Sequence, residues 1–479
     1  MTTASEPGYP SARIAWTMVA ILTVANASAF VDRFVLALLV TPIRADLGIS
    51  ETQMGLLLGV PFALFYAVAG VPIGWLADRK SRRGIVAASI GIWSLMTMSC
   101  AAARSFGGLF VARMGVAIGE AGLWPAAYSM IADSFPPRRL ATAMSVFSLG
   151  IFLGAGLANV VGGALVAAVS TTTLWSVPIL GDVKTWQVIF LGVGAPGLVI
   201  ALVARLLPEP ARRRGASMSA APVILSDGPV ILSDAKDLLA PQAQVLRSAQ
   251  DDEVSRRRSA QDDKHELVVF LKRHWFMLAA FTLGVSFFAT VNNGIAGWLP
   301  TFFQRTHGWT AAQAGLVAGT FTMTIGVAGA LFGGWWADRL RARGRADADL
   351  IVFLAGSLSM GVGATIFPLM PTGVGAAAVL ALVNFPAAFP FGVTAAAING
   401  VAPSRIRGRL SALFLMVTNL LGLAVGPWVV AYMTEQLFHD DQAIRYSLAI
   451  LAAVGHSLAL LCMLAARRPY RAARSLVPA

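Results

Sequence analysis

Four ionisable side chains lie within stretches that are otherwise apolar enough to cross a lipid bilayer. Asp32 and Arg33 interrupt the first such stretch, and Arg113 and Glu120 interrupt the fourth. Charged groups at membrane depth are costly and usually face a cavity or a charged partner, so we interpret these residues as functional. Arg113 and Glu120 are about two helical turns apart and therefore share one face of a helix.

Two carboxylates beside two arginines could bind and release protons. An arginine favours the charged form of a neighbouring carboxylate, so its movement changes the affinity of that carboxylate for a proton. We predict that Asp32 and Glu120 are the proton-coupling residues, and that Arg33 and Arg113 supply counter-charge or bind an anionic substrate group. Either carboxylate could carry the coupled proton. The alternative is a buried salt-bridge network between the two helices that does not titrate.

The elements that must hold these side chains are membrane-spanning helices. Of the 479 residues, 57% are hydrophobic and only 13% are charged, whereas about a quarter of the residues in soluble proteins are charged. The apolar blocks are long enough to cross a bilayer, which takes about 20 residues. We predict an all-α integral membrane protein with twelve transmembrane helices in two six-helix halves. The helices are expected at 14–40, 53–78, 84–103, 107–132, 140–168 and 186–207, and at 274–299, 311–338, 349–369, 374–399, 408–433 and 443–466.

The charges of the loops indicate the orientation of the chain and argue against one class of partner. Basic residues, which give the chain its net charge of +13, cluster in alternate loops, and such loops are cytoplasmic in membrane proteins. Both termini are therefore expected in the cytoplasm, and nucleic acid is not an expected partner. Cys100 and Cys462 lie in two predicted spans and indicate neither a disulfide framework nor a metal site.

The chain divides into four parts by composition. Residues 1–207 and 273–467 are the N-terminal and C-terminal six-helix halves, residues 208–272 are a polar cytoplasmic linker, and residues 468–479 are a cytoplasmic tail. The linker carries two short duplications, 222–227 repeated at 229–234 and 247–252 repeated at 258–263. It has too little apolar surface to fold alone, so we expect a largely disordered segment rather than a regulatory unit.

The two halves repeat each other in sequence. The stretch 74–79, which closes the second predicted span, recurs at 334–339. At the same offset of 260 residues, Asp32 and Arg33 correspond to Asn292 and Asn293 in the seventh span. Duplicated six-helix halves are typical of secondary transporters, which bind their substrate between the halves near the middle of the membrane.

These motifs resemble the major facilitator superfamily. The resemblance rests on the stretch 74–83, on its copy from Gly334, and on 113–119, where Ala117 stands in place of a glycine common in the superfamily. Within the superfamily, stretches 30–33 and 119–128 resemble the bacterial spinster-like transporters, and 62–66 and 131–137 strengthen this likeness. Organic-anion/proton symporters share the Asp-Arg and Glu-Ala-Gly patterns of the first and fourth spans.

The resemblance implies a gating latch on the cytoplasmic side. In the superfamily, the aspartate of this motif and its copy hold the two halves together. The glycine of the motif permits close approach to a neighbouring helix. The latch would consist of Gly74, Asp78, Arg79, Arg82, Arg83, Gly334, Asp338 and Arg339.

A further set of polar and aromatic residues could line a cavity between the halves. We expect this set to contain Tyr66, Tyr128, Asn292, Asn293 and Asn384. Trp298 lies at the end of its predicted span, before Pro300, so we instead expect it in an interfacial aromatic belt.

Together these features predict a proton-coupled secondary active transporter that moves a small or amphipathic organic solute by alternating access. The resemblance implies a lysolipid or an organic anion as substrate, and a sugar-acid or aromatic-acid/proton symporter is the alternative. An uncoupled facilitator or a transporter-derived receptor is the alternative of another class. The sequence contains no nucleotide-binding loop or metal-ligand cluster, so we expect no enzyme, cofactor or metal. We expect a monomer in the inner membrane of a bacterium.

Overall fold

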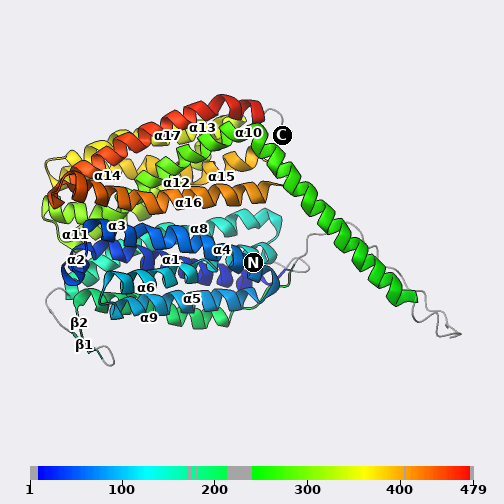
Figure 1. The fold of residues 1–479 in the computed structure, drawn as a ribbon, viewed down its shortest axis with the longest axis horizontal. Helices are drawn as coiled ribbons and strands as arrows, with labels where there is room; N and C mark the ends of the chain where they lie inside the picture. Colours follow the sequence, from blue (N-terminus) through cyan, green and yellow to red (C-terminus); the bar gives the residue numbers. More distant parts are fainter. Residues whose placement is uncertain (1–8, 170–174, 178–180, 213–239, 404–405, 475–479) are drawn as a thin grey trace.

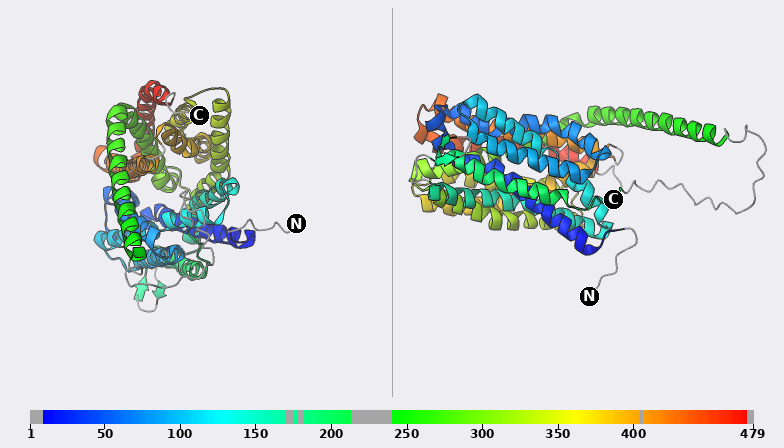
Figure 2. Two further views of the ribbon diagram at one scale, coloured as in Figure 1. Left: turned by 90° about the vertical axis from the view of Figure 1, so that its right-hand side faces the viewer. Right: turned by 90° about the horizontal axis from the view of Figure 1, so that it is seen from below.

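Long helices run side by side along the molecule and form two layers (Figure 1). The computed structural model describes residues 9–169, 175–177, 181–212, 240–403 and 406–474. Helices before residue 213 form one layer and helices after residue 273 form the other, which the turned views also show (Figure 2). The predicted all-α membrane fold with two helical halves is therefore confirmed.

The first half contains the predicted spans one to six. Its helices are α1 (Ala12–Leu38), α2 (Val40–Leu47), α3 (Glu51–Val60), the π-helical turn η1 (Pro61–Phe65), α4 (Tyr66–Arg79), α5 (Arg82–Ser99), the 3₁₀ turn η2 (Cys100–Ala102), α6 (Phe106–Glu120), α7 (Leu123–Ser134), α8 (Pro137–Val169) and α9 (Thr185–Arg205). Between α8 and α9 lies a small antiparallel hairpin that we did not predict, formed by β1 (Trp175–Val177) and β2 (Gly181–Val183).

The second half contains spans seven to twelve. Its helices are α10 (Ala240–His307), α11 (Ala311–Phe321), the π-helical turn η3 (Thr322–Gly326), α12 (Val327–Ala342), α13 (Ala348–Ile366), the 3₁₀ turn η4 (Phe367–Leu369), α14 (Gly373–Ala387), α15 (Pro390–Val401), α16 (Arg407–Tyr432), the π-helical turn η5 (Met433–Leu437), the 3₁₀ turn η6 (Asp441–Ala443) and α17 (Ile444–Arg474).

Eleven of the twelve predicted spans match helical stretches that are long and apolar enough to cross a membrane within the described residues, and one of these, Phe106–Ser134, joins α6 and α7. The tenth, predicted at 374–399, is instead divided into α14 and α15. Pro390 begins α15, and a proline is tolerated in the first turn of a helix but interrupts a helix interior, because it lacks an N–H and clashes with the preceding turn. The predicted boundaries of this span are right, but its continuity is wrong.

The internal repeat is visible in the local structure of both halves. Gly48 and Gly308, 260 residues apart, both adopt the left-handed conformation, with φ of 61° and 66°. Two residues later, Ser50 and Thr310 each begin a helix with a capping box, in which the side chains of the cap and of the third helical residue satisfy each other's backbone N–H groups. The π-helical turns η1 and η3 also occupy matching positions.

The helices end on two sides of the molecule. One side contains Gly48, Glu51, Gly308 and Asp441, and we call it the Glu51 end. The other contains Arg82, Glu209 and Asp347, among others, and we call it the Arg82 end. The loops rich in basic residues are those of the Arg82 end.

Glycines bring the two halves into close contact between α3 and α16 and between α8 and α11. A Cβ atom at Gly59 would lie 2.0 Å from the carbonyl oxygen of Leu423, and one at Gly315 would lie 2.1 Å from that of Asn159. A larger residue would therefore force the helices apart, as in other membrane helix pairs that pack through small residues.

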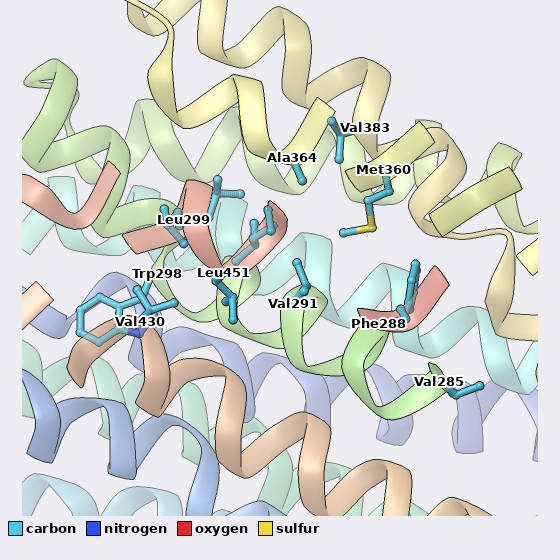
Figure 3. Close-up of a cluster of buried hydrophobic side chains, with 14 of the residues drawn as sticks. Val285, Phe288, Val291, Trp298, Leu299, Met360, Ala364, Val383, Val430 and Leu451 are labelled. Carbon is cyan, nitrogen blue, oxygen red and sulfur yellow. The ribbon is translucent and has the colours of Figure 1, made fainter. Parts of the chain in front are cut away.

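A cluster of buried hydrophobic side chains extends through the second half (Figure 3) and continues into the first half at residues such as Val35, Met54 and Trp186. It joins Val285, Phe288 and Val291 of α10 to helices α13, α14, α16 and α17. Trp298 belongs to this cluster, is fully buried, and donates its indole N–H to the carbonyl oxygen of Pro427 at 2.9 Å. The predicted place of Trp298 in an interfacial belt is wrong, because α10 continues past Pro300 to His307.

Helix α10 extends well beyond the second half. Residues 240–272, which we expected to belong to a largely disordered linker, are helical, and this part of α10 projects from the helical body (Figures 1 and 2). Ala, Gln and Arg are frequent in it and favour a helix, so a shortage of apolar residues does not prevent helix formation. His274, with φ −115° and ψ 18°, interrupts the regular helix. Residues 213–239 lie outside the described residues.

The predicted tail, 468–479, is in part a continuation of the last helix. Helix α17 continues to Arg474, and Tyr470 is buried and donates its hydroxyl to the carbonyl oxygen of Ala397 at 3.2 Å. Residues 475–479 lie outside the described residues.

Candidate functional site

Helices α1 and α6 bring the four predicted ionisable residues together in the first half. The guanidinium of Arg33 pairs with the carboxylate of Glu120, with 2.5 Å between Nη2 and Oε2. The guanidinium of Arg113 donates to the backbone carbonyl oxygens of Asp32 and Arg33, at 2.9 and 3.3 Å. Asp32, Arg113 and Glu120 are buried, whereas the Arg33 side chain is 18% exposed. The predicted grouping is therefore present, and its role in proton coupling stays a prediction.

The carboxyl group of Asp32 differs from that of Glu120 in its contacts. Among the described residues, neither of its oxygen atoms has a hydrogen-bond partner, because Arg113 binds the backbone of Asp32 rather than its side chain. The indole N–H of Trp93 and the hydroxyl of Thr97 lie beside this carboxyl without meeting hydrogen-bond geometry. A buried carboxyl without hydrogen bonds is costly, so packing alone does not explain Asp32.

The π-helical turn η1 and the start of α4 place aromatic rings against both guanidinium groups. The ring centroid of Phe62 lies 4.5 Å from Cζ of Arg33 and 4.6 Å from Cζ of Arg113. The ring of Tyr66, a predicted cavity residue, lies 5.8 Å from Cζ of Arg33. These distances are within the range of cation–π attraction, and π-helical turns occur frequently at functional sites. The charge cluster thus has contributions from α1, η1, α4 and α6.

The glycines of α6 form a separate face that packs against α5. A Cβ atom at Gly115 would lie 2.5 Å from the sulfur of Met96, and one at Gly119 would lie 2.6 Å from the backbone nitrogen of Trp93. Small residues four positions apart permit such close helix packing. The motif at 113–119 therefore combines a packing face toward α5 with a charged face toward α1.

The other predicted cavity residues lie elsewhere. Tyr128 on α7 is 37% exposed and packs edge-to-face on Trp124 and Phe147. In the second half, Asn293 and Asn384 each donate to the backbone carbonyl four residues earlier in their own helix, at 2.8 and 2.9 Å. Asn292 is half-buried beside Asn293 on α10. The amides thus belong to the half opposite the four charges, and their exposure to substrate stays a prediction.

The predicted latch residues Arg82 and Arg83 make their contacts within the first half. The buried guanidinium of Arg82 bonds Glu209 at 3.0 Å and the hydroxyl of Ser129 at 3.0 Å, and it also pairs with Asp133. Arg83 donates to the carbonyl oxygen of Leu207 at 3.1 Å. These bonds attach the start of α5 to α7 and to the segment after α9.

Glu209 caps the first turn of α5. Its carboxylate accepts hydrogen bonds from the backbone N–H groups of Arg82 and Arg83, at 3.1 and 3.0 Å, and from the hydroxyl of Ser81 at 2.7 Å. Negative charge is favourable at this position of a helix. Partial burial raises the pKa of Glu209, but the hydrogen bonds from Ser81, Arg83 and Arg82 outweigh it and hold the pKa below its ordinary value.

Among the described residues, the remaining latch residues make contacts within their own helices rather than between the two halves. Asp338 is exposed and pairs with Arg341 of its own helix, and Arg79 and Arg339 lie over the rings of Trp75 and Trp335 in their own helices. A Cβ atom at Gly74 or at Gly334 would meet nothing within 4 Å. The expected close packing at these glycines is therefore not present in this conformation. The side chain of Asp78 lies outside the described residues.

A second charged group, which sequence reasoning missed, joins the halves at the Glu51 end. The buried carboxylate of Glu51, in the first turn of α3, accepts hydrogen bonds from Arg305 of α10 at 2.7 and 3.0 Å and pairs with Arg44 of α2. Asp441 of η6 lies 2.8 Å from Arg44 and 3.5 Å from Arg305. We call these four residues the Glu51 cluster. Arg44 and Arg305 are among the few basic residues on this side of the chain, and the sequence contains no signal that they share one carboxylate.

Comparison with known proteins places this arrangement among membrane transporters. Residues 22–427 match the sequence pattern of the family described as the Major Facilitator Superfamily. An "MFS-type efflux pump" of Mycolicibacterium smegmatis is 29% identical over 470 residues, which cover 96% of this chain and 94% of the relative. A "D-galactonate transporter" of Escherichia coli is 25% identical over 414 residues, which cover 85% of this chain and 86% of the relative.

The fold is similar to that of a solved transporter. The crystal structure of a bacterial homolog of the human lysosomal transporter spinster, in an inward-facing and unoccupied conformation, matches with a TM-score of 0.71. The two chains are 23% identical, and the match covers 97% of this chain and 98% of the other. The likeness to a spinster homolog agrees with the resemblance inferred from the motifs.

Proposed function

We propose that this chain, which belongs to the major facilitator superfamily and resembles a bacterial spinster homolog in its fold, transports an organic anion together with protons by alternating access. The observation that carries the proposal is the charge cluster of Asp32, Arg33, Arg113 and Glu120. Its four formal charges cancel when both carboxylates are ionised, and it is largely buried.

Charge balance links protons to an anion. Protonation of either carboxylate leaves the cluster with one uncompensated guanidinium, and an uncompensated charge at low dielectric is costly. An anionic group of the substrate restores neutrality. Arg113 already donates to the backbone carbonyl oxygen of Asp32 at 2.9 Å, so its guanidinium lies next to the residue that carries this carboxylate. A proton and Arg113 are then alternative partners for the same group.

The contacts between the halves support alternating access. The Glu51 cluster and the glycine contacts of α3 and α11 join the halves at the Glu51 end, whereas Gly74 and Gly334 face open space at the Arg82 end. The basic loops lie at the Arg82 end, and the positive-inside rule supports a cytoplasmic location for this end. We therefore interpret the conformation as open to the cytoplasm, with both termini on that side.

The substrate class follows from the chemistry of the cluster and from one relative. Guanidinium groups bind carboxylates and phosphates well, which fits a sugar acid, an aromatic acid or a lysolipid headgroup. The relative named as a D-galactonate transporter carries a sugar acid by its name. We therefore choose D-galactonate as the first transport probe and a lysophospholipid as the second. We further propose that the protein acts as a monomer, lies in a bacterial inner membrane and carries a small solute.

Proteoliposomes test the proposal. Purified protein should accumulate one of the two probes against its gradient when a pH gradient is imposed. Glu120→Gln or Asp32→Asn should abolish this accumulation while probe exchange across the membrane, which needs no net proton movement, continues. Asp182→Asn, which removes an exposed carboxylate in β2, serves as the control.

Two outcomes would refute parts of the proposal. Wild-type flux that only dissipates a probe gradient would make the protein an uncoupled facilitator. Normal accumulation in both Glu120→Gln and Asp32→Asn would reduce the Arg33–Glu120 pair to a structural salt bridge between α1 and α6.

A further inference from the structure

Trp93 and Thr97 of α5 are buried polar residues that the four charges do not explain. Both side chains are fully buried, and among the described residues neither the indole Nε1 nor the hydroxyl Oγ1 has a hydrogen-bond partner. The two residues are about one helical turn apart, so they lie on the same face of α5. That face meets the carboxyl group of Asp32, whose oxygens also lack hydrogen bonds.

The hydroxyl of Thr97 lacks the intrahelical bond that several buried threonines make, and among the described residues the buried Thr301 of α10 also lacks a partner. The hydroxyls of Thr290, Thr418 and Thr434 each donate to the carbonyl oxygen four residues earlier, at 2.8 to 2.9 Å. This bond is a common arrangement for a threonine within a helix, and Thr97 lacks it. Its hydroxyl is therefore available to a group outside its own helix.

The indole of Trp93 is also an exception. The buried indoles of Trp186 and Trp298 donate to Asp46 and to the carbonyl oxygen of Pro427, at 2.7 and 2.9 Å, as buried tryptophans usually do. Trp93 makes no such bond, although the close contact of its backbone with Gly119 holds it against α6. The indole N–H of Trp93 and the hydroxyl of Thr97 therefore lack acceptors, and they lie beside the carboxyl group of Asp32, which lacks donors.

We propose that Trp93 and Thr97 are positioning residues that donate hydrogen bonds to the carboxylate form of Asp32 during the transport cycle. The inference rests on the proposed proton coupling and adds α5 to it. Arg113 and these two donors would stabilise the same carboxylate in different conformations, and a small shift of α5 relative to α1 would complete the bonds. The other ionisable groups facing Asp32 are Glu120 and Arg113 of α6 and the thiol of Cys100, and Arg33 follows it on α1.

Infrared spectroscopy tests this proposal without a substrate. The carboxylic-acid C=O stretching band of the purified protein in lipid is followed across pH, and Asp32→Asn identifies the part of the band that belongs to Asp32. Hydrogen bonds to a carboxylate favour the charged form, so their loss makes the group keep its proton to higher pH. We expect Thr97→Val and Trp93→Phe each to raise the titration midpoint by about one pH unit.

Two control variants separate hydrogen bonding from packing. Thr97→Ser keeps the hydroxyl and should keep the wild-type midpoint. Ser94→Ala removes a buried hydroxyl that lies against Gly197 of α9 rather than against Asp32, and it should also leave the midpoint unchanged.

Several results would overturn the inference. These are unchanged midpoints in Thr97→Val and Trp93→Phe, an equal shift in Ser94→Ala, or the absence of any band from Asp32. Failure of the proposed function gives a different pattern. In that case the Asp32 band still shifts in Thr97→Val, while probe uptake by the wild-type protein does not respond to a pH gradient.

Discussion

Substitution of Glu51 by glutamine should shift the protein away from the conformation described here. Glu51 is completely buried and holds Arg305 of the second half and Arg44 of the first. Loss of one partner from a buried, hydrogen-bonded charge pair costs about 2 to 5 kcal/mol. Asp441 still pairs with both arginines, and their side chains are 21% and 11% exposed. We therefore expect the lower value, about 2 kcal/mol.

A change of this size corresponds to about a 30-fold shift in the equilibrium between joined and separated halves at the Glu51 end. Spin labels at Ala45 of α2 and Gln442 of η6, two exposed positions in opposite halves, report this equilibrium by double electron–electron resonance after both cysteines are replaced by alanine. Glu51→Gln should produce a population at longer distance that is much smaller in the wild-type protein.

The same measurement can refute the reasoning. An unchanged distance distribution in Glu51→Gln would show that the Glu51 cluster does not hold the halves together. Asp182→Asn removes a carboxylate from the same end without touching the cluster and should have no effect. The charge-reversed pair Glu51→Arg with Arg305→Glu keeps the number of charges and should restore the short distance in part.

Three further predictions concern the first half and the helix contacts. Glu209→Gln should destabilise the protein by about 1 kcal/mol at neutral pH, because it weakens the cap of α5. Since the pKa of Glu209 is lowered in the folded protein, the stabilisation by this carboxylate is present above its ordinary pKa of about 4.3 and is lost as the pH falls further. Thermal unfolding of the wild-type protein and of Glu209→Gln across pH should therefore show a difference in stability that shrinks in acid. Arg113→Lys should reduce proton-driven uptake of the probe at least about tenfold, because lysine cannot reach two carbonyl oxygens with a fixed fork; near-normal uptake by a stable variant would contradict the role of the guanidinium. Gly315→Ala should lower the thermal stability, since its Cβ would lie 2.1 Å from the carbonyl oxygen of Asn159, whereas Gly334→Ala, with nothing within 4 Å, should change it by less than about 0.5 kcal/mol. Equal losses in the two glycine variants would contradict the contact between α8 and α11.

The charge cluster could be predicted from the sequence because its signal is local. A charged residue in an apolar span is unusual wherever its partners lie, and the periodicity of a helix places Arg113 and Glu120 on one face without further information. The repeat of 74–79 at 334–339 likewise needs only the sequence. These features therefore identified both the fold and the residues of the candidate site.

Partners across the fold could not be predicted in the same way. Arg305 and Glu51 are 254 residues apart, and nothing in either stretch indicates the other. Arg82 was assigned to a latch between the halves, but Glu209, 127 residues later, offers a closer carboxylate within its own half. Trp93 and Thr97 were missed because tryptophan and threonine are ordinary residues in a membrane helix, and only their missing partners distinguish them.

The matched features of the two halves also bear on the evolutionary origin of the internal repeat. The left-handed glycines Gly48 and Gly308 and the capping boxes that follow them recur at one offset, and the π-helical turns recur within one residue of it, as expected if both halves descend from one six-helix ancestor. Asp32 and Arg33 have no charged counterpart, since Asn292 and Asn293 occupy their places. The backbone frame is thus common to both halves, whereas the ionisable side chains at these positions occur in one half only.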